Sequence, residues 1–167
     1  MAIITLGGTP VNTVGELPEV GAKAPDFKLT ASKDMSTKSL KDFDGARLVL
    51  NIFPSVDTGV CSQSVRTFNK KAGGLENTKV LCISKDLPFA MERFCGAEGL
   101  DNVETLTDYK TGDFGEAYGV TFVDGAFESL LSRAIVVVDK DGKVIHTEQV
   151  PEIGNEPNYE AALEALS

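Results

Sequence analysis

The sequence is poor in the residues that build structural metal sites and disulfide frameworks. It contains one histidine and three cysteines, Cys61, Cys82 and Cys95, and no two cysteines form a Cys-x-x-Cys pair. Structural zinc sites use closely spaced pairs, and small disulfide-stapled domains carry an even number of cysteines. We therefore expect no bound metal and no structural disulfide framework. In a reducing compartment, any bond between two of these thiols would form transiently and for chemistry.

Positive charge and long apolar runs are also scarce. The chain has 16 Lys and Arg residues against 25 Asp and Glu residues, which gives a formal net charge of -9. Nucleic acids and anionic membranes both need a basic surface, so neither is expected as a partner. No apolar run approaches the roughly 18 residues of a membrane span, and the Met1–Ile4 start has no basic segment before a long apolar stretch. We expect a soluble, cytoplasmic protein.

Three other kinds of site are disfavoured. His146, the single histidine, lies in the middle of a predicted strand, whereas a Cys-His hydrolase would need it oriented against Cys61. The segment Asp139–Gly142 lacks the remaining ligand positions and the closing glutamate of a calcium loop, so a hairpin turn is the better interpretation. Among the many carboxylates, no pair stands out as a glycosidase pair would.

Length and periodicity predict one α/β domain over residues 1–167. A chain of this length with 42% apolar residues can bury a single core. Strand-like and helix-like segments alternate, which predicts a parallel-rich central sheet with helices on both faces. Residues 1–17 are expected to form a hairpin extension that turns at Gly7-Gly8, and we assign it no chemistry. The predicted strands are a short one that is entered through residues 20–29, then 47–53, 79–84, 133–139 and 143–149. The predicted helices are 61–72, 88–95, 112–119 and 158–166.

The most informative stretch covers Leu48–Phe68. The apolar run Leu48–Phe53 ends at Pro54, and after a short polar loop a helical pattern begins at Cys61. Free amides and the positive end of the helix dipole favour an anion at a helix N-terminus, where a cysteine pKa can fall from about 8.5 to roughly 3.5–7.5. Thr58 has the spacing of an N-cap hydroxyl that accepts a bond from the N3 amide, and it could also reach the sulfur. The pattern therefore predicts a reactive thiolate at Cys61.

From Phe53 to Cys61 this stretch reads Phe-Pro-Ser-x-Asp-Thr-x-Val-Cys, and an arginine follows at position 66. The segment resembles the active-site motif of peroxiredoxins, and it matches the thiol peroxidase branch, the atypical two-cysteine peroxiredoxins, most closely. The resemblance extends over nearly the whole chain, through Ala24–Phe27, Arg93–Leu100 and Ser132–Ala134. It implies a thioredoxin-like peroxiredoxin fold, in which helices flank a central mixed sheet.

The resemblance also implies a thiol-dependent peroxidase with an antioxidant role. The Cys61 thiolate would attack hydrogen peroxide or an organic hydroperoxide and become a sulfenic acid. Cys95 would resolve it as an intramolecular Cys61–Cys95 disulfide, which thioredoxin would reduce. Thr58 would offer a hydroxyl, Pro54 would shield the sulfur from water, and Arg133 would stabilise the thiolate and the departing oxygen. The family commonly forms homodimers, and the resemblance implies no cofactor and no metal.

Two further residues need an assignment. Cys82 lies between Leu81 and Ile83 in a predicted strand, which favours core packing. Arg66 is the alternative to Arg133 beside the sulfur, and its competing interpretation is a surface salt bridge. The resemblance alone favours Arg133.

Two other functions are compatible with the same thiols. One is a redox sensor or disulfide-exchange protein, which peroxide would oxidise without rapid turnover in a thioredoxin system. The other is a thioredoxin-fold binding module with structural cysteines, which would gain neither oxygen nor a disulfide after one equivalent of peroxide.

Overall fold

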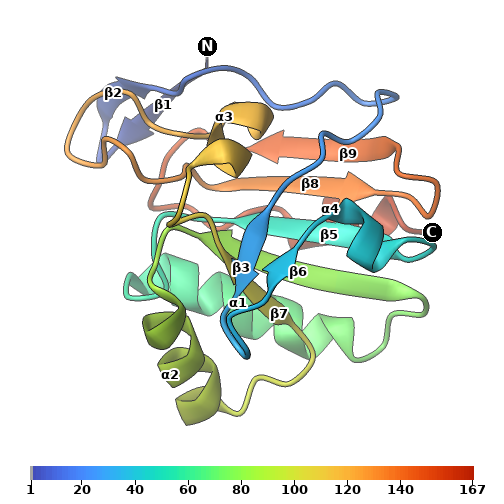
Figure 1. Cartoon of the computed structure of the whole chain (residues 1–167). Helices are drawn as coiled ribbons and strands as arrows, with labels where there is room; N and C mark the ends of the chain where they lie inside the picture. Colours follow the sequence, from blue (N-terminus) through green and yellow to red (C-terminus); the bar gives the residue numbers. More distant parts are fainter. Residues whose placement is uncertain (1) are drawn as a thin grey trace.

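A seven-stranded mixed sheet forms the centre of the molecule (Figure 1). The structure is a computed structural model that describes residues 2–167. The strand order across the sheet is β4-β3-β7-β6-β5-β8-β9. Its strands are β3 (Leu29–Ala31), β4 (Thr37–Lys38), β5 (Arg47–Ile52), β6 (Thr78–Ser84), β7 (Glu104–Thr107), β8 (Ala134–Val138) and β9 (Val144–Gln149).

Strand direction in this sheet differs in part from the sequence prediction. The pairs β5–β6 and β6–β7 are parallel, as the alternation of strands and helices predicts. The pairs β3–β4, β3–β7, β5–β8 and β8–β9 are antiparallel. The prediction of parallel strands therefore holds for β5, β6 and β7, which helical crossovers join, whereas the strands before and after them add antiparallel pairs. The mixed sheet implied by the family resemblance is confirmed.

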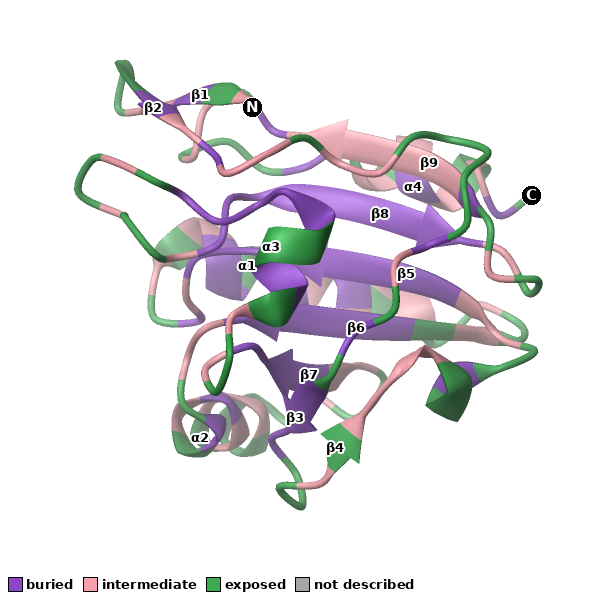
Figure 2. Ribbon diagram, turned by 45° about the horizontal axis from the view of Figure 1, so that its top comes forward, coloured by how far each residue is buried: buried purple, intermediate pink, exposed green. Residues whose placement is uncertain are grey.

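Helices cover both faces of the sheet, as predicted. On one face, α1 and α4 pack against Val49, Val80 and Val137. On the other face, α3 packs against Leu50 and Val136, which alternate with the first set along the same strands. Figure 2 shows that β5, β6 and β8 are buried between these layers. The helices are α1 (Gly59–Ala72), α2 (Pro88–Glu98), α3 (Asp113–Tyr118), α4 (Tyr159–Glu164) and the short 3₁₀ helix η1 (Leu40–Phe43).

The N-terminal hairpin is confirmed and forms its own small sheet. Strands β1 (Ile3–Leu6) and β2 (Thr9–Asn12) pair antiparallel around Gly7 and Gly8. Both glycines have positive φ, 57° and 87°, which a two-residue hairpin turn of this kind requires. The hairpin packs its own apolar cluster against residues of the 122–130 loop and against Ile153. It lies at the opposite end of the sheet from α2 (Figures 1 and 2).

Some element boundaries differ from the prediction. Helix α1 begins at Gly59, two residues earlier than expected, so Cys61 occupies its third position. Helix α2 continues through Gly96 and ends at Gly99, which has a left-handed conformation with φ 65°. Strands β4 and β7 were not predicted, because two and four residues are too short for a clear periodic signal.

None of the helices within residues 2–167 is long and apolar enough to cross a membrane. Across the same residues, no three histidine, cysteine, aspartate or glutamate side chains are grouped so that they could hold a metal ion.

Candidate functional site

The Cys61 sulfur lies at the start of α1 and is fully buried. Nη2 of Arg133 donates to its Sγ across 3.4 Å. Strand β8 runs antiparallel to β5 with Ala134 opposite Ile52, so the residue before β8 lies beside the loop that follows β5. The guanidinium can make a charge-assisted hydrogen bond to the sulfur. The sheet therefore pairs this cysteine with a permanent positive charge that is 72 positions away in the sequence.

Arg133 is almost completely buried, with 2% of its surface exposed. Its Nε and Nη2 both donate to the carbonyl oxygen of Ile153, at 3.0 and 2.8 Å. Its Nη1 has no hydrogen-bond partner within residues 2–167. Leaving a buried charged donor unpaired costs free energy, so such a group is suited to an acceptor that arrives with a ligand. Because Nη2 of the same guanidinium contacts the Cys61 sulfur, the free Nη1 is a hydrogen-bond donor next to that sulfur.

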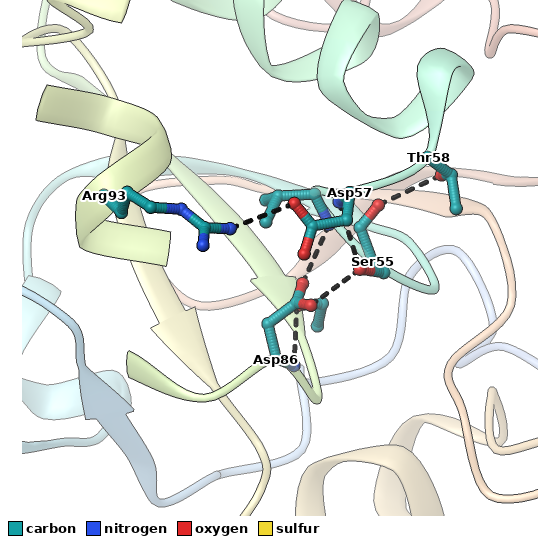
Figure 3. Close-up of polar contacts among 7 residues, drawn as sticks. Ser55, Asp57, Thr58, Asp86 and Arg93 are labelled. Atoms are coloured by element: carbon teal, nitrogen blue, oxygen red, sulfur yellow. Dashed lines mark hydrogen bonds and ion pairs between the residues drawn. The ribbon is translucent and has the colours of Figure 1, made fainter. Parts of the chain in front are cut away.

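The loop between β5 and α1 is held in place by Asp86 (Figure 3). Oδ1 of Asp86 accepts from the Ser55 hydroxyl at 2.7 Å, and Oδ2 accepts from the Val56 amide at 2.8 Å. Asp86 follows β6, which is parallel to β5, so the carboxyl ends of the two strands lie at one edge of the sheet. Sequence patterns alone did not indicate Asp86 or the role of Ser55. The available signal was a carboxylate placed just after the second parallel strand.

Thr58 and Pro54 both belong to this loop. The Thr58 backbone caps α1, since its carbonyl accepts from the Ser62 amide at 2.9 Å. The predicted bond from an α1 amide to the Thr58 hydroxyl is wrong, because no side-chain capping bond forms and the hydroxyl donates to the Ser55 carbonyl at 3.0 Å instead. This arrangement leaves the acceptor lone pairs of the hydroxyl available. Pro54 is buried at the bend where β5 ends.

Cys95 lies near the end of α2 and is half-buried. Its sulfur faces the Thr105 hydroxyl on β7 at 3.9 Å. Burial raises the pKa of the Cys95 thiol, and the carboxylates of Glu92 and Asp101 raise it further. In this conformation, Cys95 therefore favours the protonated and less nucleophilic form.

Cys82 is a core residue, as the sequence predicted. It is fully buried within β6, and the Asn51 side-chain amide donates to its sulfur at 3.6 Å. Burial raises the pKa of this thiol to about 12. Cys82 therefore remains a neutral thiol at neutral pH.

Two surface ion pairs join α2 to the Cys61 loop and helix. Nε of Arg66 on α1 lies 2.6 Å from Oε1 of Glu98, and its guanidinium carbon lies 5.5 Å from the Phe94 ring centre. Nη2 of Arg93 lies 3.3 Å from Oδ1 of Asp57, toward which it points in Figure 3. Arg66 therefore makes a surface salt bridge, which is the alternative to a contact with the Cys61 sulfur that the sequence left open.

Comparison with known proteins places this geometry in a family context. The model of the Redoxin family matches residues 19–163. The thiol peroxidase of Mycobacterium bovis is 58% identical over 166 residues, which is 99% of each chain. The thiol peroxidase of Corynebacterium glutamicum is 51% identical over 167 residues, the full length of both chains.

The crystal structure of a peroxiredoxin-like protein from Aquifex aeolicus superposes on this chain with a TM-score of 0.92. The two chains are 36% identical, and the match covers 99% of this chain and 96% of the other. The fold implied by the resemblance, a thioredoxin-like peroxiredoxin fold with a mixed central sheet and flanking helices, is confirmed.

Proposed function

This chain belongs to the Redoxin family, in its thiol peroxidase group, and from that premise we propose that Cys61 reduces hydroperoxides and that Cys95 resolves the product. The family supports a thiol-dependent peroxidase with an antioxidant role. The observation that carries the residue assignment is the buried Arg133, which donates to the Cys61 sulfur and keeps Nη1 free beside it.

In the proposed first step, the Cys61 thiolate attacks the terminal oxygen of a hydroperoxide. A sulfur–oxygen bond forms, the oxygen–oxygen bond breaks, and the sulfur is oxidised by two electrons to a sulfenic acid. The departing oxygen carries negative charge until it takes a proton and leaves as water or an alcohol. The free Nη1 of Arg133 would stabilise that charge, and the Thr58 hydroxyl would accept from the incoming hydroperoxide. Pro54 would keep bulk water from the sulfur.

In the proposed second step, the Cys95 sulfur attacks the sulfenic sulfur and displaces water. The resulting Cys61–Cys95 disulfide would then be reduced by a dithiol protein such as thioredoxin. The raised pKa of Cys95 comes first from burial, so exposure of α2 would lower it toward its ordinary value. The movement that brings Cys95 to Cys61 would therefore also activate it.

This second step requires a large movement of α2. The Cys95 sulfur contacts β7, and the Cys61 sulfur contacts the residue that precedes β8. Cys61 itself follows β5, which is two positions from β7 in the sheet, and this corresponds to roughly 10 Å at about 4.8 Å per strand. A disulfide needs a sulfur–sulfur distance of about 2.05 Å. Helix α2 must therefore leave the sheet and break the Arg66–Glu98 and Arg93–Asp57 pairs.

We expect amide hydrogen exchange over residues 87–100 to be faster in the disulfide form than in the dithiol form. Helix α2 is short and carries exposed charges, which are marks of a local unit of low stability. The amides of β5, β6 and β8 serve as the internal control and should keep their protection. Equal protection of residues 87–100 in both forms, alongside a confirmed Cys61–Cys95 bond, would contradict the movement.

The proposed function is tested by peroxide consumption with thioredoxin, thioredoxin reductase and NADPH. The wild type should turn over many times. A Cys95→Ser variant should consume about one equivalent and then stop, with one added oxygen atom in its mass spectrum, because the sulfenic acid has no internal thiol to capture it. Sustained turnover of Cys95→Ser would overturn the resolving role. A wild type that is oxidised but does not turn over would identify a redox sensor, and one that gains no oxygen and no disulfide would identify a binding module.

We further propose a homodimer, in keeping with the family resemblance. Leu87 and Phe89 at the start of α2 are 55% and 71% exposed, and both lie within three positions of Asp86, which holds the Cys61 loop. Apolar side chains exposed beside a site are suited to contact with a second chain. The cytoplasm is the proposed compartment, because a disulfide that forms and is reduced in each cycle needs a reducing environment.

A further inference from the structure

We propose that the N-terminal hairpin positions the Arg133 guanidinium for the reaction, and that Glu152 is the residue that fastens the hairpin to the segment holding Arg133. This inference rests on the proposed roles of Cys61 and Arg133. Nothing in the sequence assigns the hairpin any chemistry. In the structure, the hairpin and the arginine are connected by a continuous series of hydrogen bonds.

A single carbonyl fixes the orientation of the guanidinium. Nε and Nη2 of Arg133 both donate to the Ile153 oxygen, at 3.0 and 2.8 Å. Two donors on one acceptor set the plane of the group, and the remaining contact of Nη2 is with the Cys61 sulfur. A shift of the Ile153 carbonyl would therefore move both the contact to the sulfur and the free Nη1.

The hairpin holds Ile153 by its backbone and its side chain. The Ile153 amide donates to the Thr5 carbonyl at 2.9 Å, and the Thr5 amide donates to the Pro151 carbonyl at 2.9 Å. Residues 151–153 thus lie alongside β1 like a short third strand, with Thr5 bridged to Glu152 in parallel. The Ile153 side chain packs against the cluster formed by Ile4, Val11 and Phe122.

Glu152 closes this arrangement with three hydrogen bonds. Its Oε1 accepts from the Thr5 hydroxyl and the Gly8 amide, both at 2.9 Å, and its Oε2 accepts from the Gly154 amide at 2.8 Å. The amides of Gly154 and Gly8 lower the pKa of Glu152 to about 2. A lowered pKa stabilises the fold above the ordinary value of 4.5, and the benefit is lost only as the pH falls toward 2. The Glu152 carboxylate is therefore ionised throughout the neutral pH range.

Asp124, in the 122–130 loop, provides a matched control because it holds β2, the other strand of the hairpin. Its Oδ1 accepts from the Asn12 amide and its Oδ2 from the Asn12 side-chain amide, both at 2.8 Å. It fastens β2 to the 122–130 loop, and within residues 2–167 it makes no hydrogen bond to residues 151–153. Removal of either carboxylate loosens the hairpin, but only Glu152 lies in the segment that holds Arg133.

The test compares Glu152→Ala, Asp124→Ala and Arg133→Ala in the full-length protein. The chain has no tryptophan to report on oxidation, so Cys61 oxidation by hydrogen peroxide is followed by rapid quench and mass spectrometry at several pH values. Glu152→Ala should slow oxidation about ten- to a hundredfold, since a misplacement of about 1 Å can cost that much. It should also move the pH midpoint of oxidation upward. Asp124→Ala should lose stability to denaturant without moving that midpoint.

Glu152→Gln should restore part of the rate, because its amide oxygen can still accept from Thr5 and Gly8, and it keeps the test valid if the alanine variant does not fold. If Glu152→Ala behaves like Asp124→Ala while Arg133→Ala slows oxidation, the positioning role is overturned and the proposed function stands. If Arg133→Ala leaves the rate and the pH midpoint unchanged, the proposed role of Arg133 fails and this inference fails with it.

Discussion

Replacement of Cys61 by serine is expected to reduce peroxide consumption to the background rate in a protein that still folds. The Cys61 sulfur is the atom to which Arg133 donates, and the site offers it a positive charge in a buried environment. A serine hydroxyl is not ionised at neutral pH, and its oxygen is a poor nucleophile toward a peroxide bond. The measurement is steady-state peroxide consumption with thioredoxin, thioredoxin reductase and NADPH. Appreciable turnover of Cys61→Ser would refute the assignment of the nucleophile.

Cys82→Ser is the matched control for that substitution. Cys82 is also fully buried, but burial raises the pKa of its thiol to about 12, so it stays neutral. The variant should retain most of the activity and lose on the order of 1–3 kcal/mol of unfolding free energy, because a buried hydroxyl is costly where its partners are imperfect. A Cys82→Ser protein that is folded but inactive would show that the thiols were misassigned.

The local features of the site could be predicted from the sequence because short-range patterns determine them. The apolar run that ends at Pro54 and the helix that follows it place Cys61 in the first turn of α1. The Gly7-Gly8 turn and the β8–β9 hairpin follow in the same way from neighbouring residues. The direction of the Thr58 hydroxyl did not follow, because the Ser55 carbonyl competes with the helix amides for it.

The features that could not be predicted depend on contacts between distant segments. Asp86 reaches the Cys61 loop only because β5 and β6 are parallel and end at the same edge of the sheet. Strand β7 is too short to recognise, yet it carries Thr105, which faces the Cys95 sulfur. The hairpin looks like an appendage in the sequence, and its connection to Arg133 through Ile153 appears only when the chain is folded. Such pairings are set by sheet register, which single-residue patterns do not encode.

Arg133→Ala is expected to slow the oxidation of Cys61 by roughly 10²–10³-fold, the usual cost of removing a donor aimed at developing charge. The variant loses the only described donor to the Cys61 sulfur and also the free Nη1 beside it. Without a positive charge beside the sulfur, oxidation should need a higher pH to reach its full rate, so the pH midpoint of oxidation should move upward. Rapid-quench oxidation measured at several pH values reports both effects.

Arg66→Ala is the control, because Arg66 is the other arginine of the sequence motif. Its guanidinium pairs with Glu98 on the surface, where 41% of its side chain is exposed, and such a pair contributes less than about 1 kcal/mol. The first oxidation step should therefore stay close to the wild-type rate. Arg133→Lys adds a second comparison, since a lysine keeps the charge but lacks the planar fork that binds the Ile153 carbonyl through two nitrogens. We expect it to recover only part of the lost rate. A larger effect of Arg66→Ala than of Arg133→Ala would reverse the assignment of the two arginines.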